Sequence, residues 1–191
     1  MCIRDRCRSF DRAPVDAKEA AYVRLLTPAI KYWVCKSAPG FLYEAMECLG
    51  GNGYVEEGIL ARHYREAPVN AIWEGSGNVM CLDVLRALSR EPDTASGIVH
   101  ELTGETLGLP GAGDAVTFIG KAFRRPDSER VARLAVEKLA LLAASAALNA
   151  VSVRHAQLFA ATRLAGNHAG MYGAVDLAHD DIRGLLGRAL P

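Results

Sequence analysis

The sequence predicts an all-α protein, on three observations. Half of the 191 residues are hydrophobic and 23% are charged, so most of the chain should fold around a core. Ala, Leu, Arg and Glu are plentiful while Val, Ile and aromatic residues are sparse, which favours helices over strands. Apolar residues also recur at spacings of three and four, the period of a buried helical face.

The first helix is expected over residues 15–36. Leu25, Ala29 and Trp33 lie on one apolar face of it. Pro28 should kink or interrupt this helix, because proline lacks an N–H and its ring clashes with the preceding turn.

Two shorter helices should follow. One is expected over 41–49, after the segment "SAPG", and should stop at Gly50 and Gly51, since glycine supplies the unusual backbone that ends helices. The other is expected over 58–65 and should end before Pro68.

The segment "NAIWEGSGN", residues 70–78, should be an irregular loop that leads into a helix over 77–89. Ser76 suits the N-cap, because its hydroxyl can accept a backbone N–H of the first turn. Glu74 then lies just outside the positive end of the helix dipole. A surface acid at such a position is the simplest interpretation of this residue.

The C-terminal half is also predicted to be helical. A Gly/Pro-rich turn, "GLPGAGD", is the best candidate for a domain boundary within it. The longest expected helix would measure about 55 Å, so it needs a partner along its whole length or must break. The helices are expected over 94–106, 115–123, 128–164 and 178–188.

The cysteines argue against disulfide and zinc frameworks. They are odd in number, without C-x-x-C spacing or a nearby His pair. Cys35, Cys48 and Cys81 lie in apolar helical contexts and should be small core residues. The chain shows neither a signal peptide nor an apolar run of about 20 residues, so we expect a soluble, cytoplasmic protein.

Several common motifs are absent from the sequence. It contains no P-loop, no G-x-S-x-G and no complete G-x-G-x-x-G, and its five His residues show no metal-ligand spacing. Residues 1–6, "MCIRDR", resemble the translation of a transposase adapter used in sequencing libraries, and are excluded from fold reasoning. The chain should then be the C-terminal fragment of a longer protein.

Two segments together resemble the C-terminal helical domain of the acyl-CoA dehydrogenases. They are "AMECLGGNGYVEE", residues 45–57, and "REAPVNAIWEGSGNVMCLDVLR", residues 65–86. The family pattern is a helix ending in L-G-G-x-G-Y, a short helix with R-[DE], and an E-G-[TS] loop that opens another helix. The form "IWEGSGNVMCLDVLR" resembles the AidB-type DNA alkylation response flavoproteins, and "FAATRLAG" is similar to part of their C-terminal extension.

This resemblance implies an up-and-down helical bundle over residues 7–92, incomplete at its N-terminus, and a helical extension over 93–191. It also implies FAD as cofactor, an acyl-CoA substrate and a homotetramer arranged as a dimer of dimers. We expect little FAD affinity or activity from these 191 residues alone.

Glu74 falls on the family's catalytic base, which removes the α-proton of an acyl-CoA while the β-hydrogen leaves as hydride to flavin N5. Enclosed by Trp73 and an acyl chain, its carboxylate would lose solvation, and its pKa would rise toward that of a useful base. The other positions carried over are Gly75 and Arg86 near the substrate, Ser76, Gly77 and Asn78 at FAD, and Gly50 and Gly51 at the FAD of a neighbouring subunit. The sequence departs from the usual pattern at Glu47 (commonly Gln), Trp73 (commonly Tyr) and Ser76 (commonly Thr).

Two other hypotheses stay open. Residues 121–191 carry 10 basic and 6 acidic side chains, so the protein could be an AidB-like flavoprotein that binds and protects double-stranded DNA. Under that hypothesis phosphate contacts would come from Arg86, Arg124, Arg125, Arg130 and Arg133. The third hypothesis is a helical assembly module without a site.

Overall fold

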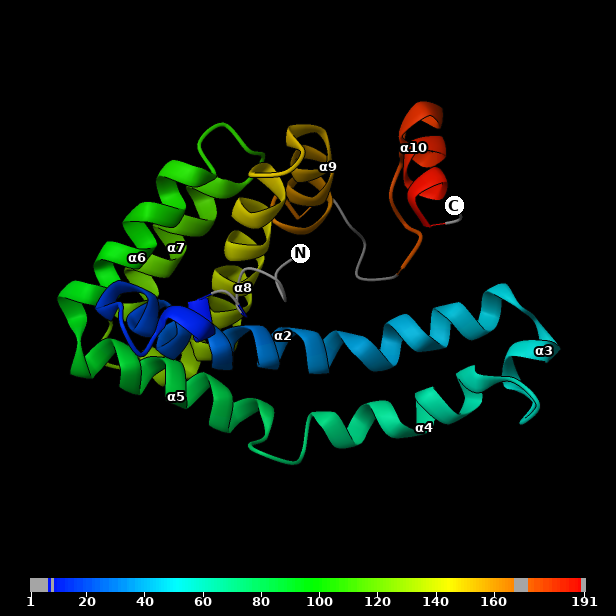
Figure 1. Cartoon of the computed structure of the whole chain (residues 1–191), viewed down its shortest axis with the longest axis horizontal. Coiled ribbons are helices and arrows are strands. Elements are labelled where there is room, and N and C mark those ends of the chain that lie inside the picture. The colour runs from blue at the N-terminus through cyan, green and yellow to red at the C-terminus, as the bar shows by residue number, and fades with distance from the viewer. Residues whose placement is uncertain (1–6, 8, 167–171, 190–191) are drawn as a thin grey trace.

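The structure is a computed structural model that describes residues 7, 9–166 and 172–189. Within those ranges every regular element is a helix, which confirms the all-α prediction (Figure 1). The adapter-like residues 1–6, with Cys2 among them, lie outside the described residues. The elements are α2 (Ala17–Cys48), α3 (Gly51–Tyr54), α4 (Ile59–Asn70), α5 (Gly77–Arg90), α6 (Pro92–Glu105), α7 (Ala112–Phe123), the 3-10 helix η1 (Ser128–Val131), α8 (Ala132–Asn149), α9 (Val153–Arg163) and α10 (His179–Ala189).

Helix α2 is one continuous helix where the sequence predicts two. The Asp16 carboxylate begins it by accepting the backbone N–H of Lys18 at 2.9 Å. The helix then continues through Pro28 and Pro39, so an interruption at Pro28 and a break at the segment "SAPG" are both wrong. Each proline removes one helical hydrogen bond. Burial of Leu25 and Ala29 on the same face as Pro28 outweighs that loss.

Helices α4 and α5 run back along α2 in the opposite direction, and both pack on it (Figure 1). Helix α4 extends past Pro68 to Asn70, so the end expected before that proline is also wrong. The loop between α4 and α5 therefore lies over the middle of α2, and the α2–α3 turn lies at the far end of the pair. This arrangement positions both segments that the family resemblance singles out.

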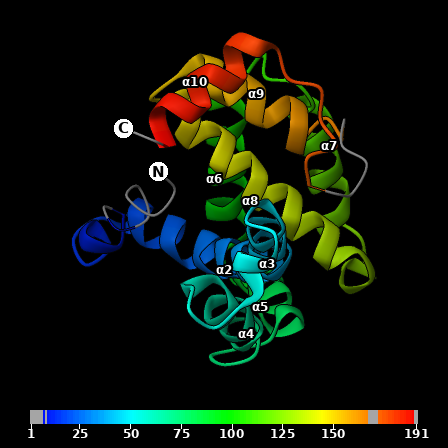
Figure 2. The same ribbon diagram turned by 90° about the vertical axis from the view of Figure 1, so that its right-hand side faces the viewer.

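The long helix expected over 128–164 is broken into η1, α8 and α9. Residues 150–152 make the turn between α8 and α9, and the Ser152 hydroxyl caps α9 by accepting the N–H of His155 at 3.5 Å. Helix α9 folds back on α8, while α6 and α7 pack on other sides of it (Figure 2). Because α8 is surrounded along its length, Val136, Leu139 and Leu142 are completely buried.

One hydrophobic core joins the N-terminal and C-terminal halves. Leu25 of α2 and Val84 of α5 belong to the same buried cluster as Leu102, Ile119 and Leu142 of the later helices. Core packing therefore crosses from residues 7–92 into residues 93–191. The boundary between these ranges stays a prediction from the resemblance.

The cysteines differ partly from expectation. Cys81 is fully buried, and burial raises the pKa of its thiol to about 11. Cys35 is only half-buried and Cys48 is exposed, so the core role expected of Cys48 is wrong. Within the described ranges no helix is both long and apolar enough to span a membrane.

An ion pair joins the N-terminal half of α2 to the middle of α5. Arg24 donates two hydrogen bonds to the Asp83 carboxylate, at 2.7 and 2.8 Å, and so holds the pKa of that carboxyl below its usual value. The stabilisation is present above the unfolded pKa of about 3.9 and is lost as pH falls through the lower folded value. Both side chains are partly exposed, so we expect Arg24→Met to cost about 1 kcal/mol at pH 7. In urea unfolding this cost should vanish below the folded pKa of Asp83; a cost independent of pH would contradict the assignment.

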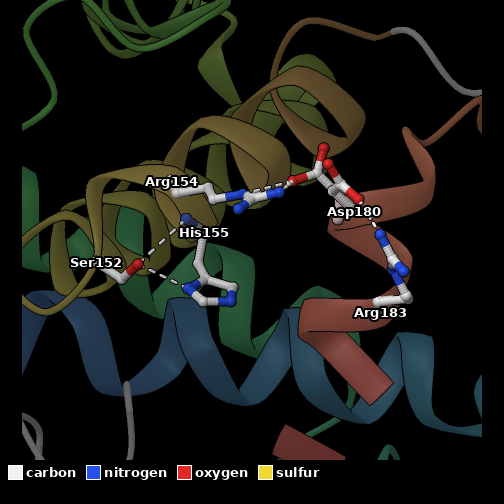
Figure 3. A network of polar contacts seen from close by, with 6 residues as sticks. Ser152, Arg154, His155, Asp180 and Arg183 are labelled. Carbon is white, nitrogen blue, oxygen red and sulfur yellow. Dashed lines mark hydrogen bonds and ion pairs between the residues drawn. The ribbon is translucent and has the colours of Figure 1, made fainter. Parts of the chain in front are cut away.

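Helix α10 is attached to the rest of the fold mainly through polar contacts. Arg154 of α9 donates to Asp181 of α10 at 2.6 Å, beside an Asp180–Arg183 pair within α10 (Figure 3). None of the α10 residues is buried. Between α2, α8, α9 and α10 lies a cavity of about 990 Å³ with a mostly apolar lining.

Deleting residues 177–191 should therefore change the free energy of unfolding by less than about 1 kcal/mol. Little apolar surface leaves water when α10 docks, so little stability is lost without it. Thermal unfolding followed by circular dichroism measures this, with Arg154→Met as the variant that removes only the ion pair. A large loss of stability on deletion would show that α10 belongs to the core.

Candidate functional site

The candidate site centres on the loop between α4 and α5, which carries Glu74. The loop leaves α4 through a tight turn in which Ile72 and Trp73 donate their N–H groups to the Val69 carbonyl, at 2.9 and 3.1 Å. Glu74 then has φ +56°, and it is the one non-glycine among the described residues with a positive φ. Side chains rarely adopt this conformation, which persists where the surroundings enforce it and is common at functional sites.

Gly75 continues the unusual backbone with φ +116°, a value that a side chain would strain. A Cβ there would also meet the Met80 methyl at 2.4 Å. The glycine after Glu74 is therefore required by the loop itself. Its predicted place beside a substrate stays a prediction.

Ser76 occupies the N-cap position of α5, as predicted, with extended backbone. Its hydroxyl makes no capping hydrogen bond, so the expected bond to the first turn is wrong. The next residue, Gly77, is buried against α2: a Cβ there would lie 2.8 Å from Lys36 Cε and 3.3 Å from the Tyr32 ring. Close packing of α5 on α2 thus explains the glycine at this position.

One side chain of α8 forms a hydrogen bond with the first turn of α5. Arg133 Nε donates to Asn78 Oδ1 at 2.8 Å. Asn78 is exposed and is one of the residues that the resemblance places at FAD. The predicted extension therefore supports the same helical turn that the predicted cofactor site uses.

Lys31 of α2 anchors the loop through two hydrogen bonds. Its Nζ donates to the carbonyl oxygens of Trp73 and Gly75, at 2.7 and 2.9 Å. These two residues flank Glu74. Sequence reasoning missed Lys31, since it lies more than 40 residues from the loop and belongs to none of the family motifs.

Trp73 and Glu74 are both exposed in this chain. Trp73 is 58% exposed. The enclosure expected to desolvate the carboxylate is therefore not formed by residues of this chain. A substrate, a cofactor or another part of a larger protein would have to supply it.

The second group of predicted cofactor residues lies elsewhere. Gly50 has φ +56° and ends α2, Gly51 begins α3, and both are exposed. Helix α4, about 18 Å long, separates this turn from the Glu74 loop (Figure 1). The two groups therefore do not form one cluster within this chain, and their contacts to FAD stay a prediction.

The glycines of this turn differ in their surroundings. A Cβ on Gly51 would meet nothing within 4 Å, so no contact inside the chain explains that glycine. Gly53, which the sequence reasoning did not single out, is different: a Cβ there would lie 2.2 Å from the Met46 carbonyl oxygen. At the departure position nearby, Glu47 accepts a hydrogen bond from Tyr43, and this bond raises the pKa of the Tyr43 hydroxyl.

The arginines of the predicted sites are spread out. Arg86 is exposed on α5, about 14 Å along the helix from Gly77, so the structure does not bring it to Glu74. Arg125 and Arg130 both pair with Asp127, which neutralises part of their charge. In the described part of the chain no group of His, Cys, Asp and Glu side chains could hold a metal ion.

Comparison with known proteins identifies the class to which this arrangement belongs. The acyl-CoA dehydrogenase C-terminal domain matches residues 11–89, which include both glycine-rich segments and the Glu74 loop. Over these residues the chain is an acyl-CoA dehydrogenase C-terminal domain, which confirms the family resemblance and the predicted bundle.

Individual relatives extend this similarity. The chain is 46% identical over 140 residues to the putative acyl-CoA dehydrogenase AidB of Escherichia coli, covering 73% of this chain and 25% of AidB. An alignment of that length cannot fit within residues 1–89, so it continues into the predicted extension. The chain is also 41% identical over 91 residues to acyl-CoA dehydrogenase family member 11 of Caenorhabditis elegans, covering 46% of this chain and 15% of that protein.

A solved structure supports the fold. The crystal structure of Caenorhabditis elegans ACDH-11 in complex with C11-CoA superposes with a TM-score of 0.72 over 98% of this chain and 37% of that chain, at 23% identity. The present chain spans about a quarter or less of the length of the curated relatives it matches.

Proposed function

We propose that this chain supplies the catalytic base to an FAD-dependent acyl-CoA dehydrogenase, called here the complete enzyme, which also contains the parts that its longer relatives have. The observation that carries the proposal is the conformation of Glu74: a carboxylate with φ +56°, tied to α2 on both sides, within the matched domain. The reaction would be α,β-dehydrogenation of an acyl-CoA thioester.

The residues of the loop have separate tasks in this reaction. Glu74 removes the α-proton of the thioester, and its exposed position leaves room for a substrate above it. Gly75 keeps the space beside the carboxylate free of a side chain. The N–H groups at the start of α5 have no helical partners, so they can stabilise negative charge on the thioester oxygen as the α-proton leaves.

FAD, when bound, accepts the β-hydrogen as hydride. In this chain the residues that would hold it are Ser76, Gly77 and Asn78 at the start of α5, and Gly50 and Gly51 toward a neighbouring subunit. The Ser76 hydroxyl, which makes no capping hydrogen bond, supports this assignment. Because the two groups lie at opposite ends of α4, this assignment requires at least one further subunit to complete each site.

The test is anaerobic mixing of the complete enzyme with short branched and straight acyl-CoA thioesters. We expect the flavin to be reduced to stoichiometry by at least one of them. The 191-residue chain itself should bind no stoichiometric FAD, because it contributes only part of the site. Absence of reduction by every acyl-CoA would contradict the proposal.

A second function, binding of double-stranded DNA, has one supporting observation. Arg124, Arg125 and Arg130 are all exposed where α7 ends and η1 begins. If they contact phosphates, affinity for a duplex should fall steeply between 50 and 200 mM salt, values at which counterion release is readily measured. Affinity that does not depend on salt, or on replacing these three by Gln, would exclude it.

A further inference from the structure

One side chain connects the long helix α2 to both peptide groups around Glu74. Lys31 Nζ lies 2.7 Å from the Trp73 carbonyl oxygen and 2.9 Å from that of Gly75. The contacts cross more than 40 residues of sequence. Among the three donors of an ammonium group, two are therefore committed to this loop.

Without this cation, the two carbonyl groups would repel one another. Both oxygens carry partial negative charge, and both lie within hydrogen-bonding distance of one nitrogen, so they converge on the same point. Converging carbonyl dipoles repel one another, and a positive charge between them reverses that effect. The ammonium group thus stabilises the turn in which Glu74 lies.

The backbone of Glu74 needs such support. Its φ of +56° is unfavourable for a residue with a side chain, so a free loop would relax to another conformation. On the N-terminal side the turn is closed by the N–H groups of Ile72 and Trp73, and on the C-terminal side Gly77 packs on α2. Between these two points Lys31 bonds the carbonyl groups on both sides of Glu74, while the Ser76 carbonyl accepts the N–H of Met80 at 2.9 Å.

We propose that Lys31 is the positioning residue of Glu74: it holds the loop so that the carboxylate points consistently at the reacting carbon. The proposal deepens the proposed function and rests on it for the role of Glu74. The ammonium group does not touch the substrate in this scheme. It acts through the backbone on both sides of the base.

Amide hydrogen exchange of the 191-residue chain tests the anchoring directly. In Lys31→Met, exchange of the Ile72 and Trp73 amides should become about tenfold faster or more, because charge-assisted bonds to two carbonyls are lost. Exchange in α8 should stay unchanged. Lys31→Arg, which keeps the charge, should restore much of the protection.

Lys18→Met is the matched control. Lys18 also lies on α2 and makes a cross-helix contact, to Glu101 at 2.9 Å, but it is remote from the loop. Its replacement should leave loop exchange as in the parent chain. Equal loop exchange in Lys31→Met and the parent would overturn the proposal.

Kinetic measurements on the complete enzyme distinguish a positioning role of Lys31 from an effect on stability alone. Lys31→Met should lower kcat about tenfold or more, with KM and FAD content within about twofold of the parent. In a Glu74→Gln background the same change should have no further effect, because its target is gone. An undiminished effect in that background would overturn the positioning role. Full activity of Glu74→Gln would instead overturn the proposed role of Glu74. The hydrogen-exchange experiment tests whether Lys31 anchors the loop, and its result does not depend on the role of Glu74.

Discussion

Glu74→Gln in the complete enzyme is expected to slow flavin reduction by acyl-CoA by roughly 10²–10⁴-fold. Glutamine keeps the size and the polarity of the side chain but cannot accept a proton. The loop offers no substitute, because its other residues between α4 and α5 carry no basic or acidic side chain. Stopped-flow absorbance of the flavin measures the effect.

Glu66→Gln is the matched control for this variant. Glu66 is an exposed carboxylate on α4 that pairs with Arg62, and no role in catalysis is assigned to it. Its replacement should change the rate by less than about twofold. Equal rates for both variants would mean that Glu74 is an ordinary surface acid at a helix start.

Gly111→Ala is expected to have the largest effect on stability, about 3 kcal/mol or more. Gly111 has φ +73°, and a Cβ there would lie 2.5 Å from Ala165 N and 2.6 Å from Ala165 Cα. Those are backbone atoms at the end of α9, next to the buried Leu164, so they cannot move aside without opening the core. Urea unfolding of the 191-residue chain measures the loss.

Gly108→Ala separates the two causes of that loss. Gly108 lies in the same turn and has φ +82°, but a Cβ there would meet nothing within 4 Å. It should cost only the backbone strain, about 1 to 2 kcal/mol. If Gly111→Ala costs no more than Gly108→Ala, the close approach of the turn to α9 is not a real constraint.

The fold class and most helices could be predicted from the sequence, because apolar spacing and helix-forming residues agree over long segments. Two of the errors come from tertiary packing. Pro28 and Pro68 lie inside helices next to the buried Ala29 and Ala67, whereas no neighbour of Pro39 is buried and nothing in the structure explains its place in α2. For the helix expected over 128–164, the sequence predicts only that so long a helix must find a partner along its length or break. It does not place the break at 150–152, and it does not distinguish Ser152, which caps α9, from other serines.

The site was predictable to a lesser degree. Glu74 and the glycines are predicted as site residues because two motifs agree in order and spacing, and this prediction stays untested. The structure adds that Gly75 has a backbone that only glycine adopts easily. The positive φ of Glu74 and the contacts of Lys31 and Arg133 were not predictable, since they join residues far apart in the sequence. The structure also shows that Gly77 lies against α2, where a side chain would be crowded. This contact could not be predicted from the sequence.

The most direct test of the central claim, that Glu74 is the base that removes the α-proton, is a kinetic isotope effect. Anaerobic single-turnover reduction of the complete enzyme's flavin would be followed with an acyl-CoA deuterated at the α-carbon and with its unlabelled counterpart. We predict that the parent enzyme is slowed severalfold by the label and that Glu74→Gln reduces its flavin far more slowly with either substrate. Reduction by Glu74→Gln at the parent rate, with the same isotope effect, would show that another group removes the proton.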